Sequence, residues 1–145
     1  MWIQPFLMSF AASAGFGLLF NVPRKSVVPG AVAGMIGWVL YKALSFGYDI
    51  NVILATAVSS FVVAGISQVF ARFYKMPVIV FSVAGIIPLV PGGLAYSTMR
   101  DFVANDYNTA IGLAAEVFLL SGAIAFGLVL AGVMTQILFK RQTKA

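Results

Sequence analysis

Five long apolar segments, separated by short polar or charged turns, make up nearly all of this 145-residue chain. Hydrophobic residues account for 61% of the sequence and charged residues for only 9%. No soluble domain of this size could present such a surface to water, and a helix needs about 20 apolar residues to cross a bilayer. The sequence therefore predicts one integral membrane domain over residues 1–145, an all-α polytopic protein with five transmembrane helices.

The predicted spans leave no room for a domain outside the membrane. They cover residues 2–20, 27–46, 52–71, 76 to a proline-glycine segment at 88–93, and 110–139. Residues 72–75 are expected to form a basic turn, and 97–109 a more polar stretch before the last helix. Asn108 or Thr109 is a plausible cap for that helix. The first segment lacks the features of a cleaved signal peptide and is expected to be a retained span.

The distribution of basic residues predicts the orientation of the chain. Seven of its nine basic residues fall on one side of a five-span arrangement: Arg24, Lys25, Arg72, Lys75, Lys140, Arg141 and Lys144. The other side receives Lys42 and Arg100 with three aspartates. Because basic residues favour the cytoplasm, the N-terminus is expected outside and the C-terminus inside. The net charge of +5 is thus explained without a nucleic-acid partner. Four spans with a re-entrant fourth segment remain an alternative, against this charge rule.

Several classes of chemistry lack the residues they need. The chain has no cysteine and no histidine, which excludes thiol chemistry, disulfides, haem ligation by histidine and the usual zinc sites. It has no phosphate-binding glycine loop and no visible nucleophile–base set. We therefore expect no enzyme activity, no cofactor and no metal.

The segment Pro88-Leu89-Val90-Pro91-Gly92-Gly93 is expected to break the fourth span. Each proline removes one helical N–H and clashes with the carbonyl four residues earlier, which would leave Ala84 and Ile87 unpaired. Unpaired backbone within a membrane is tolerated where it lines a wet cavity, as in the binding sites of many transporters. The alternative is that the span ends at Pro88 and a surface loop follows.

Glu116 is the one acidic residue within an apolar run. Counted from the expected helix start at about 1.5 Å per residue, it lies roughly 10 Å below the outer boundary, close to the depth of Pro91. An ionisable group at that depth is costly and is a functional candidate, suited to proton coupling. Alternatively, Glu116 pairs with Lys42 or joins two helices. Lys42 could also extend to the lipid headgroups.

Small residues recur at the spacing typical of helix packing in membranes. Gly30, Gly34 and Gly37 lie in the second span and Gly127 in the fifth. Small side chains let helices approach closely, so these residues predict helix–helix contacts, although generic small-residue content would look similar. Trp38 and the tyrosines are interpreted as interface anchors or packing residues.

Three motifs resemble the threonine/serine exporter family, in its short, second-component (YjjB-like) type. They are residues 15–23 (GFGLLFNVP), 34–38 (GMIGW) and 86–96 (IIPLVPGGLAY), and the resemblance covers essentially the whole chain. It implies a secondary exporter of small amino acids or dicarboxylates in the bacterial inner membrane, driven by the proton motive force. It also implies a larger partner subunit; in fused family members both parts occupy one polypeptide with about twice as many spans.

The expected substrate pathway combines motif residues with residues chosen on physical grounds. Pro88, Pro91, Gly92, Gly93 and Tyr96 match the family motif, whereas Glu116, Lys42 and Arg100 come from charge and depth alone. Glu116 would accept a proton or balance a substrate ammonium. Arg100 and Lys42 could attract a carboxylate at the outer mouth. Two other functions remain open, a non-transporting assembly or scaffold subunit and a homo-oligomeric channel.

Overall fold

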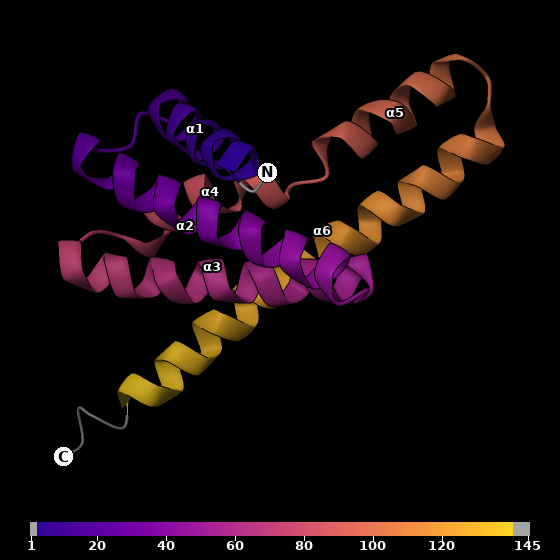
Figure 1. Cartoon of the computed structure of the whole chain (residues 1–145). Coiled ribbons are helices and arrows are strands. Elements are labelled where there is room, and N and C mark those ends of the chain that lie inside the picture. Colours follow the sequence, from indigo (N-terminus) through magenta and orange to yellow (C-terminus); the bar gives the residue numbers. More distant parts are fainter. Residues whose placement is uncertain (1–2, 141–145) are drawn as a thin grey trace.

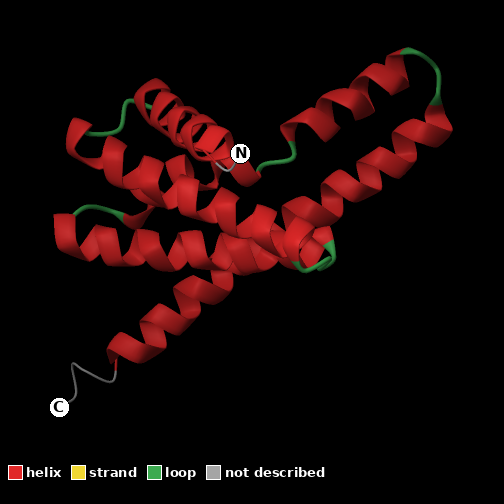
Figure 2. Ribbon diagram, in the orientation of Figure 1, coloured by secondary structure: helices red, strands yellow, loops and turns green. Residues whose placement is uncertain are grey.

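The structure of the chain is a computed structural model that describes residues 3–140 (Figure 1). Trp2, Arg141 and Lys144, which entered the predicted spans and orientation, lie outside the described residues. Six α-helices joined by short loops make up the described part, which contains no strand (Figure 2). They are α1 Ile3–Leu19, α2 Arg24–Lys42, α3 Val52–Tyr74, α4 Val78–Ile86, α5 Gly92–Val103 and α6 Tyr107–Lys140. The all-α class is therefore confirmed.

Three helical segments are long and apolar enough to cross a membrane. They are α3, α6 and α2 together with the π-helical turn Ala43–Gly47 that continues it. The pair α4 and α5 adds a fourth candidate if it is counted as one span bent by 57°. Helix α1 is apolar but has only 17 residues, so the prediction of five spans is not confirmed.

Helices α1–α4 form the body of the molecule, and α6 crosses it along α3 (Figure 1). The contact between α3 and α6 is the most extensive in the structure, followed by the contact between α1 and α2. Helix α5 packs mainly on α6 and has few contacts with the other helices. As a result, α5 and the first turns of α6 form a hairpin that projects away from the body (Figure 1).

Glycines lie where helices of the body approach most closely. A Cβ added at Gly34 would lie 3.0 Å from the Ser13 Cβ in α1 and 3.2 Å from the Gly85 carbonyl oxygen in α4. A Cβ added at Gly30 would lie 3.2 Å from the Ala84 Cβ. A Cβ added at Gly37 would collide with the Val63 side chain in α3. Without side chains at these positions, α2 can pack directly against its neighbours.

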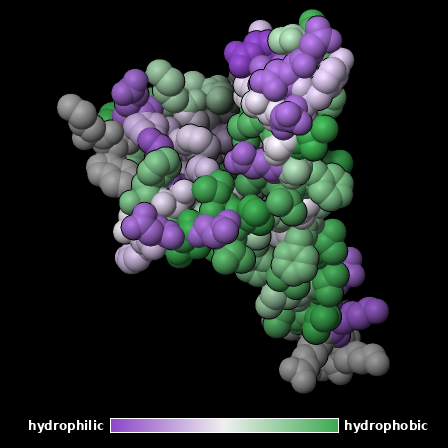
Figure 3. All heavy atoms as spheres, turned by 90° about the vertical axis from the view of Figure 1, so that its right-hand side faces the viewer, coloured by the Kyte–Doolittle hydropathy of each residue, from purple (hydrophilic) through white to green (hydrophobic). Residues whose placement is uncertain are grey.

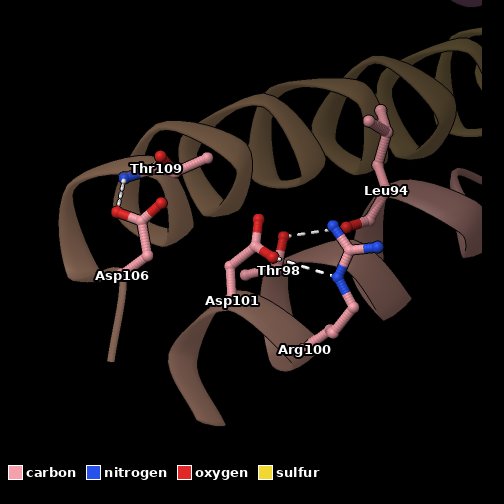
Figure 4. A network of polar contacts seen from close by, with 6 residues as sticks. All are labelled: Leu94, Thr98, Arg100, Asp101, Asp106 and Thr109. Carbon is pink, nitrogen blue, oxygen red and sulfur yellow. Dashed lines mark hydrogen bonds and ion pairs between the residues drawn. The ribbon is translucent and has the colours of Figure 1, made fainter. Parts of the chain in front are cut away.

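The predicted basic turn at 72–75 and the predicted polar stretch at 97–109 are largely helical. Residues 72–74 belong to the last turn of α3, which ends at Lys75 in the left-handed conformation. The polar stretch 97–109 contains most of α5, which is stabilised by packing on α6. The expected caps of α6 were also wrong: the backbone N–H of Thr109 donates to Asp106 Oδ1 at 3.3 Å, so Asp106 caps the helix (Figure 4).

Most of the basic residues in the described part lie at one end of the molecule. Arg24 starts α2, Arg72 lies near the end of α3 and its guanidinium lies over the Phe139 ring near the end of α6. The α2–α3 and α5–α6 loops lie at the other end (Figure 1). Figure 3 shows hydrophilic residues gathered over the tip of the α5–α6 hairpin, above a mostly hydrophobic surface.

Candidate functional site

The α4–α5 connection is a true interruption of the helix. After α4, the segment Ile87–Leu89 forms a single 3₁₀ turn, Val90 is extended, and α5 begins at Gly92. The sequence alone did not reveal which hydrogen bonds the backbone groups of the interrupted segment form. The Val90 N–H donates to the Ile87 carbonyl at 3.2 Å, so the expectation that Ile87 loses its partner was wrong. The Gly92 N–H donates to the Val90 carbonyl at 2.8 Å.

The start of α5 leaves backbone groups available. The first helical hydrogen bond joins the Ala95 N–H to the Pro91 carbonyl at 3.0 Å. Gly93 and Leu94 precede that bond, in the turn whose N–H groups have no acceptor within the helix. A Cβ added at Gly92 or Gly93 would meet no atom within 4 Å, so open space borders the backbone here.

A pocket of about 260 Å³ opens beside this interruption. One wall is the continuous run of residues 88–94, and the facing residues come from three other helices: Trp38 and Tyr41 of α2, Thr56 of α3 and Leu120 of α6. The Trp38 and Tyr41 rings are stacked, with centroids 5.3 Å apart. Ligand pockets for drug-sized molecules typically enclose about 300–1,000 Å³, so this pocket suits a small solute.

A second pocket, of about 420 Å³, lies next to the first. It is lined by Ser45, residues 49–53 of the α2–α3 loop and the start of α3, and Glu116 and Leu120 of α6. Glu116 is exposed, and it forms no hydrogen bond or ion pair with any residue in the range 3–140. The two pockets have only Leu120 in common.

The neighbours of Glu116 define its place in the fold. It lies beside the α2–α3 loop and therefore near one end of the helix bundle. Glu116 also lies one helical turn from Leu120 and hence from the pocket at the interruption.

The remaining predicted pathway residues line neither pocket. Arg100 forms an ion pair with Asp101 at 3.1 Å on the exposed side of α5 (Figure 4). Tyr96 is 70% exposed. The Lys42 ammonium lies 5.9 Å from the centre of the Phe46 ring and forms no ion pair with Glu116, so the alternative of a Lys42–Glu116 pair is not seen among the described residues.

The structure thus brings together four of the predicted residues, Pro88, Pro91, Gly92 and Gly93, and places Glu116 next to them. Sequence reasoning missed Thr56 and Leu120 because a threonine and a leucine are ordinary in an apolar helix. Trp38 and Tyr41 did carry a signal, since aromatic residues three apart share one face of a helix.

The arrangement is suited to holding a small polar solute. The Thr56 side chain is 2% exposed, and its hydroxyl donates to the Val52 carbonyl at 2.7 Å, which leaves oxygen lone pairs free to accept. Aromatic rings such as those of Trp38 and Tyr41 attract ammonium groups. Within residues 3–140, no group of three or more acidic side chains is placed to hold a metal ion.

Comparison with known proteins identifies the relatives of this chain. A family model described as "Threonine/Serine exporter, ThrE" matches residues 5–134. A protein of Haemophilus influenzae strain Rd, described as uncharacterized, is 32% identical over 145 residues. That match covers 93% of this chain and 47% of the relative, so the chain spans about half the length of the curated relative it matches. No solved structure matches the chain.

Proposed function

Because the chain belongs to the threonine/serine exporter family, we propose that it is the small membrane subunit of a proton-coupled exporter of small amino acids or dicarboxylates. Its membrane would be the bacterial inner membrane. The observation that carries this proposal is the pocket whose wall is the interrupted segment 88–94. Interrupted helices provide backbone groups for substrate binding in many secondary transporters.

The pocket offers groups that complement an amino acid. The N-terminal turn of α5 carries N–H groups and the positive end of the helix dipole, which favour a carboxylate. Trp38 and Tyr41 line the same pocket and would favour an ammonium group. Glu116, in the adjacent pocket, would accept the coupling proton or balance the substrate ammonium.

A larger subunit of the same family would complete the transporter. The support is that the relative from Haemophilus influenzae is about twice as long as the segment it shares with this chain. In the proposed orientation, the basic ends of α2, α3 and α6 face the cytoplasm. A partner that starts in the cytoplasm and ends outside would then be inverted relative to this chain, an arrangement common among secondary transporters.

A flux assay on the assembled complex tests the proposal. The chain is co-purified with its partner from native membranes, reconstituted in proteoliposomes and supplied with a panel of amino acids and dicarboxylates. We expect proton-driven flux of at least one of these substrates. Glu116→Gln should reduce that flux per complex by about tenfold, equivalent to about 1.4 kcal/mol in the barrier. Glu116→Asp, which keeps the carboxylate, should retain part of it.

Three outcomes would count against the proposal. Unchanged proton-coupled flux in Glu116→Gln would remove the coupling role of Glu116. Substitutions at the interruption that lower the yield of complex but leave flux per complex intact would indicate a scaffold subunit. Flux from this chain alone, without dependence on a proton gradient, would indicate a channel.

A further inference from the structure

Leu120 lies between the pocket at the interruption and the pocket that contains Glu116. It lines the pocket at the interruption and also the pocket that contains Glu116, and no other residue lines both. It is only 6% exposed, although residues on either side of it in α6 are open to the surroundings. Its side chain is therefore enclosed by protein at the boundary between the two cavities.

The two pockets that Leu120 separates both carry polar groups. On one side are the carboxylates of Asp49 and Glu116 and the Ser45 hydroxyl. On the other side are the open backbone of the helix interruption and the Thr56 hydroxyl. Leu120 itself offers no hydrogen bond. Narrow apolar constrictions of this kind oppose the passage of water and polar solutes, because neither is solvated there.

The pocket at the interruption also borders a third pocket. This third pocket, of about 210 Å³, is lined by Met8, Ser9 and Ala12 of α1 and shares Trp38 and Pro88 with the pocket at the interruption. The pocket at the interruption therefore shares lining residues with both of the other pockets. Leu120 is the one lining residue that the Glu116 pocket shares with the pocket at the interruption, so it lies on the direct path from one to the other.

We infer that Leu120 is the barrier between two consecutive sites on one solute route, with the Glu116 pocket as the water-exposed vestibule. A change between staggered rotamers is the smallest movement by which this side chain would open the route. The consequence for transport rests on the proposed function. The barrier itself does not, because it follows from the two pockets and the residue they share.

The chain contains no cysteine, so introduced thiols can report access directly. Ser45→Cys places a thiol in the vestibule and Thr56→Cys places one in the pocket at the interruption. The full-length protein in proteoliposomes is treated with a small, water-soluble methanethiosulfonate, and the rate of labelling is measured. We expect fast labelling at position 45 and slow labelling at position 56.

Removing the leucine side chain should open the barrier. In the Thr56→Cys background, Leu120→Ala should raise the labelling rate roughly tenfold, whereas Leu120→Phe should lower it further. Leu119→Ala is the matched control, because Leu119 is the neighbouring leucine, is 51% exposed and lines neither pocket. It should leave the rate unchanged. Leu120→Met preserves bulk and should behave like wild type, which covers the possibility that the alanine variant folds poorly.

Two results would overturn the barrier. One is equally fast labelling at positions 45 and 56 with Leu120 present. The other is a rate at position 56 that none of the Leu120 substitutions changes. In the reconstituted complex, Leu120→Ala should add flux that no longer needs a proton gradient. Absence of any flux in the wild-type complex, with the labelling pattern intact, would reject the exporter proposal and leave the barrier standing.

Discussion

Gly127 is a residue at which α6 approaches the backbone of α3 closely. A Cβ added there would lie 2.6 Å from the Ala57 carbonyl oxygen and 2.9 Å from the Phe61 backbone nitrogen, and it would collide with the Ser60 side chain. Two of these neighbours are backbone atoms of a helix, which cannot rotate aside as a side chain can. The close approach of the two helices therefore depends on the missing side chain.

Replacing this glycine should weaken the fold. We expect Gly127→Ala to lower the free energy of unfolding by about 1–3 kcal/mol, the usual cost of overpacking a well-packed contact. Gly122→Ala is the control, because a Cβ there meets nothing within 4 Å. Thermal unfolding of the purified protein in detergent would measure both. Equal stability of the two variants would show that α3 and α6 are not held at this distance.

Individual residues differ in how well the sequence reveals them. Pro88, Pro91, Gly92 and Gly93 stand out because proline and glycine are unfavourable inside a helix wherever they occur. Glu116 stands out as an acid in an apolar run, but its depth could not be derived, since it depends on how far α6 projects. Thr56 and Leu120 face the pocket only because other helices pack around them.

At the scale of elements, the bend between α4 and α5 is the feature with the most direct structural test. The two helices form an angle of 57° across the interruption. Restoring helix-forming residues should straighten the pair, because alanine keeps the N–H that proline lacks and has a higher helix propensity than glycine. The open backbone beside the pocket would then be lost.

Spin labels on Ile79→Cys and Met99→Cys, both exposed positions, would report the change. In Pro88→Ala/Pro91→Ala/Gly92→Ala/Gly93→Ala, we expect the distance between the labels to lengthen towards roughly 30 Å, the length of 20 residues in a straight helix. Pulsed electron paramagnetic resonance measures this distance, and flux should fall in parallel. Gly92→Ala/Gly93→Ala alone, with both prolines retained, should keep the bend. An unchanged distance in the quadruple variant would show that helix packing, and not the prolines and glycines, causes the bend.

Helices were predictable from apolar content, but their ends were not. The residues from Val52 to Ala71 were assigned correctly, whereas Arg72–Tyr74 continue the helix because the left-handed conformation at Lys75 is what ends it. Helix α5 escaped prediction because its sequence is mixed in polarity, and it is stabilised by packing on α6. Asp106 was overlooked as the cap because its role depends on a side-chain orientation.

At the scale of the whole molecule, the apolar composition correctly predicted long apolar helices, whereas the predicted number of spans is not confirmed and the orientation inferred from the charges stays a prediction. Helix α1 is short for a membrane span, and the α4–α5 pair could cross the membrane or turn back within it. Neither case can be resolved by counting residues, because both depend on where the bilayer lies. The family, by contrast, is evident from short motifs, since the matching region covers residues 5–134.

Sidedness labelling would settle the arrangement in the membrane. In intact cells we expect an impermeant maleimide to label Asn105→Cys, in the α5–α6 loop, and to label Lys75→Cys, in the α3–α4 loop, only after permeabilisation. Gln4→Cys should be labelled from outside if α1 crosses the membrane. Labelling of Lys75→Cys in intact cells would contradict the proposed orientation, and protection of Gln4→Cys would reduce the number of spans by one.

One wall of the pocket at the interruption is formed by seven consecutive residues, and at Gly92 and Gly93 it consists of main chain alone, which has an evolutionary consequence. Peptide groups are the same whatever side chains they bear, so inherited changes along that stretch can alter its shape but hardly its chemistry. Differences in substrate between related proteins would then arise from substitutions on the opposing faces of α2 and α3, around Trp38, Tyr41 and Thr56. Related proteins could share this wall of the pocket and still export different solutes.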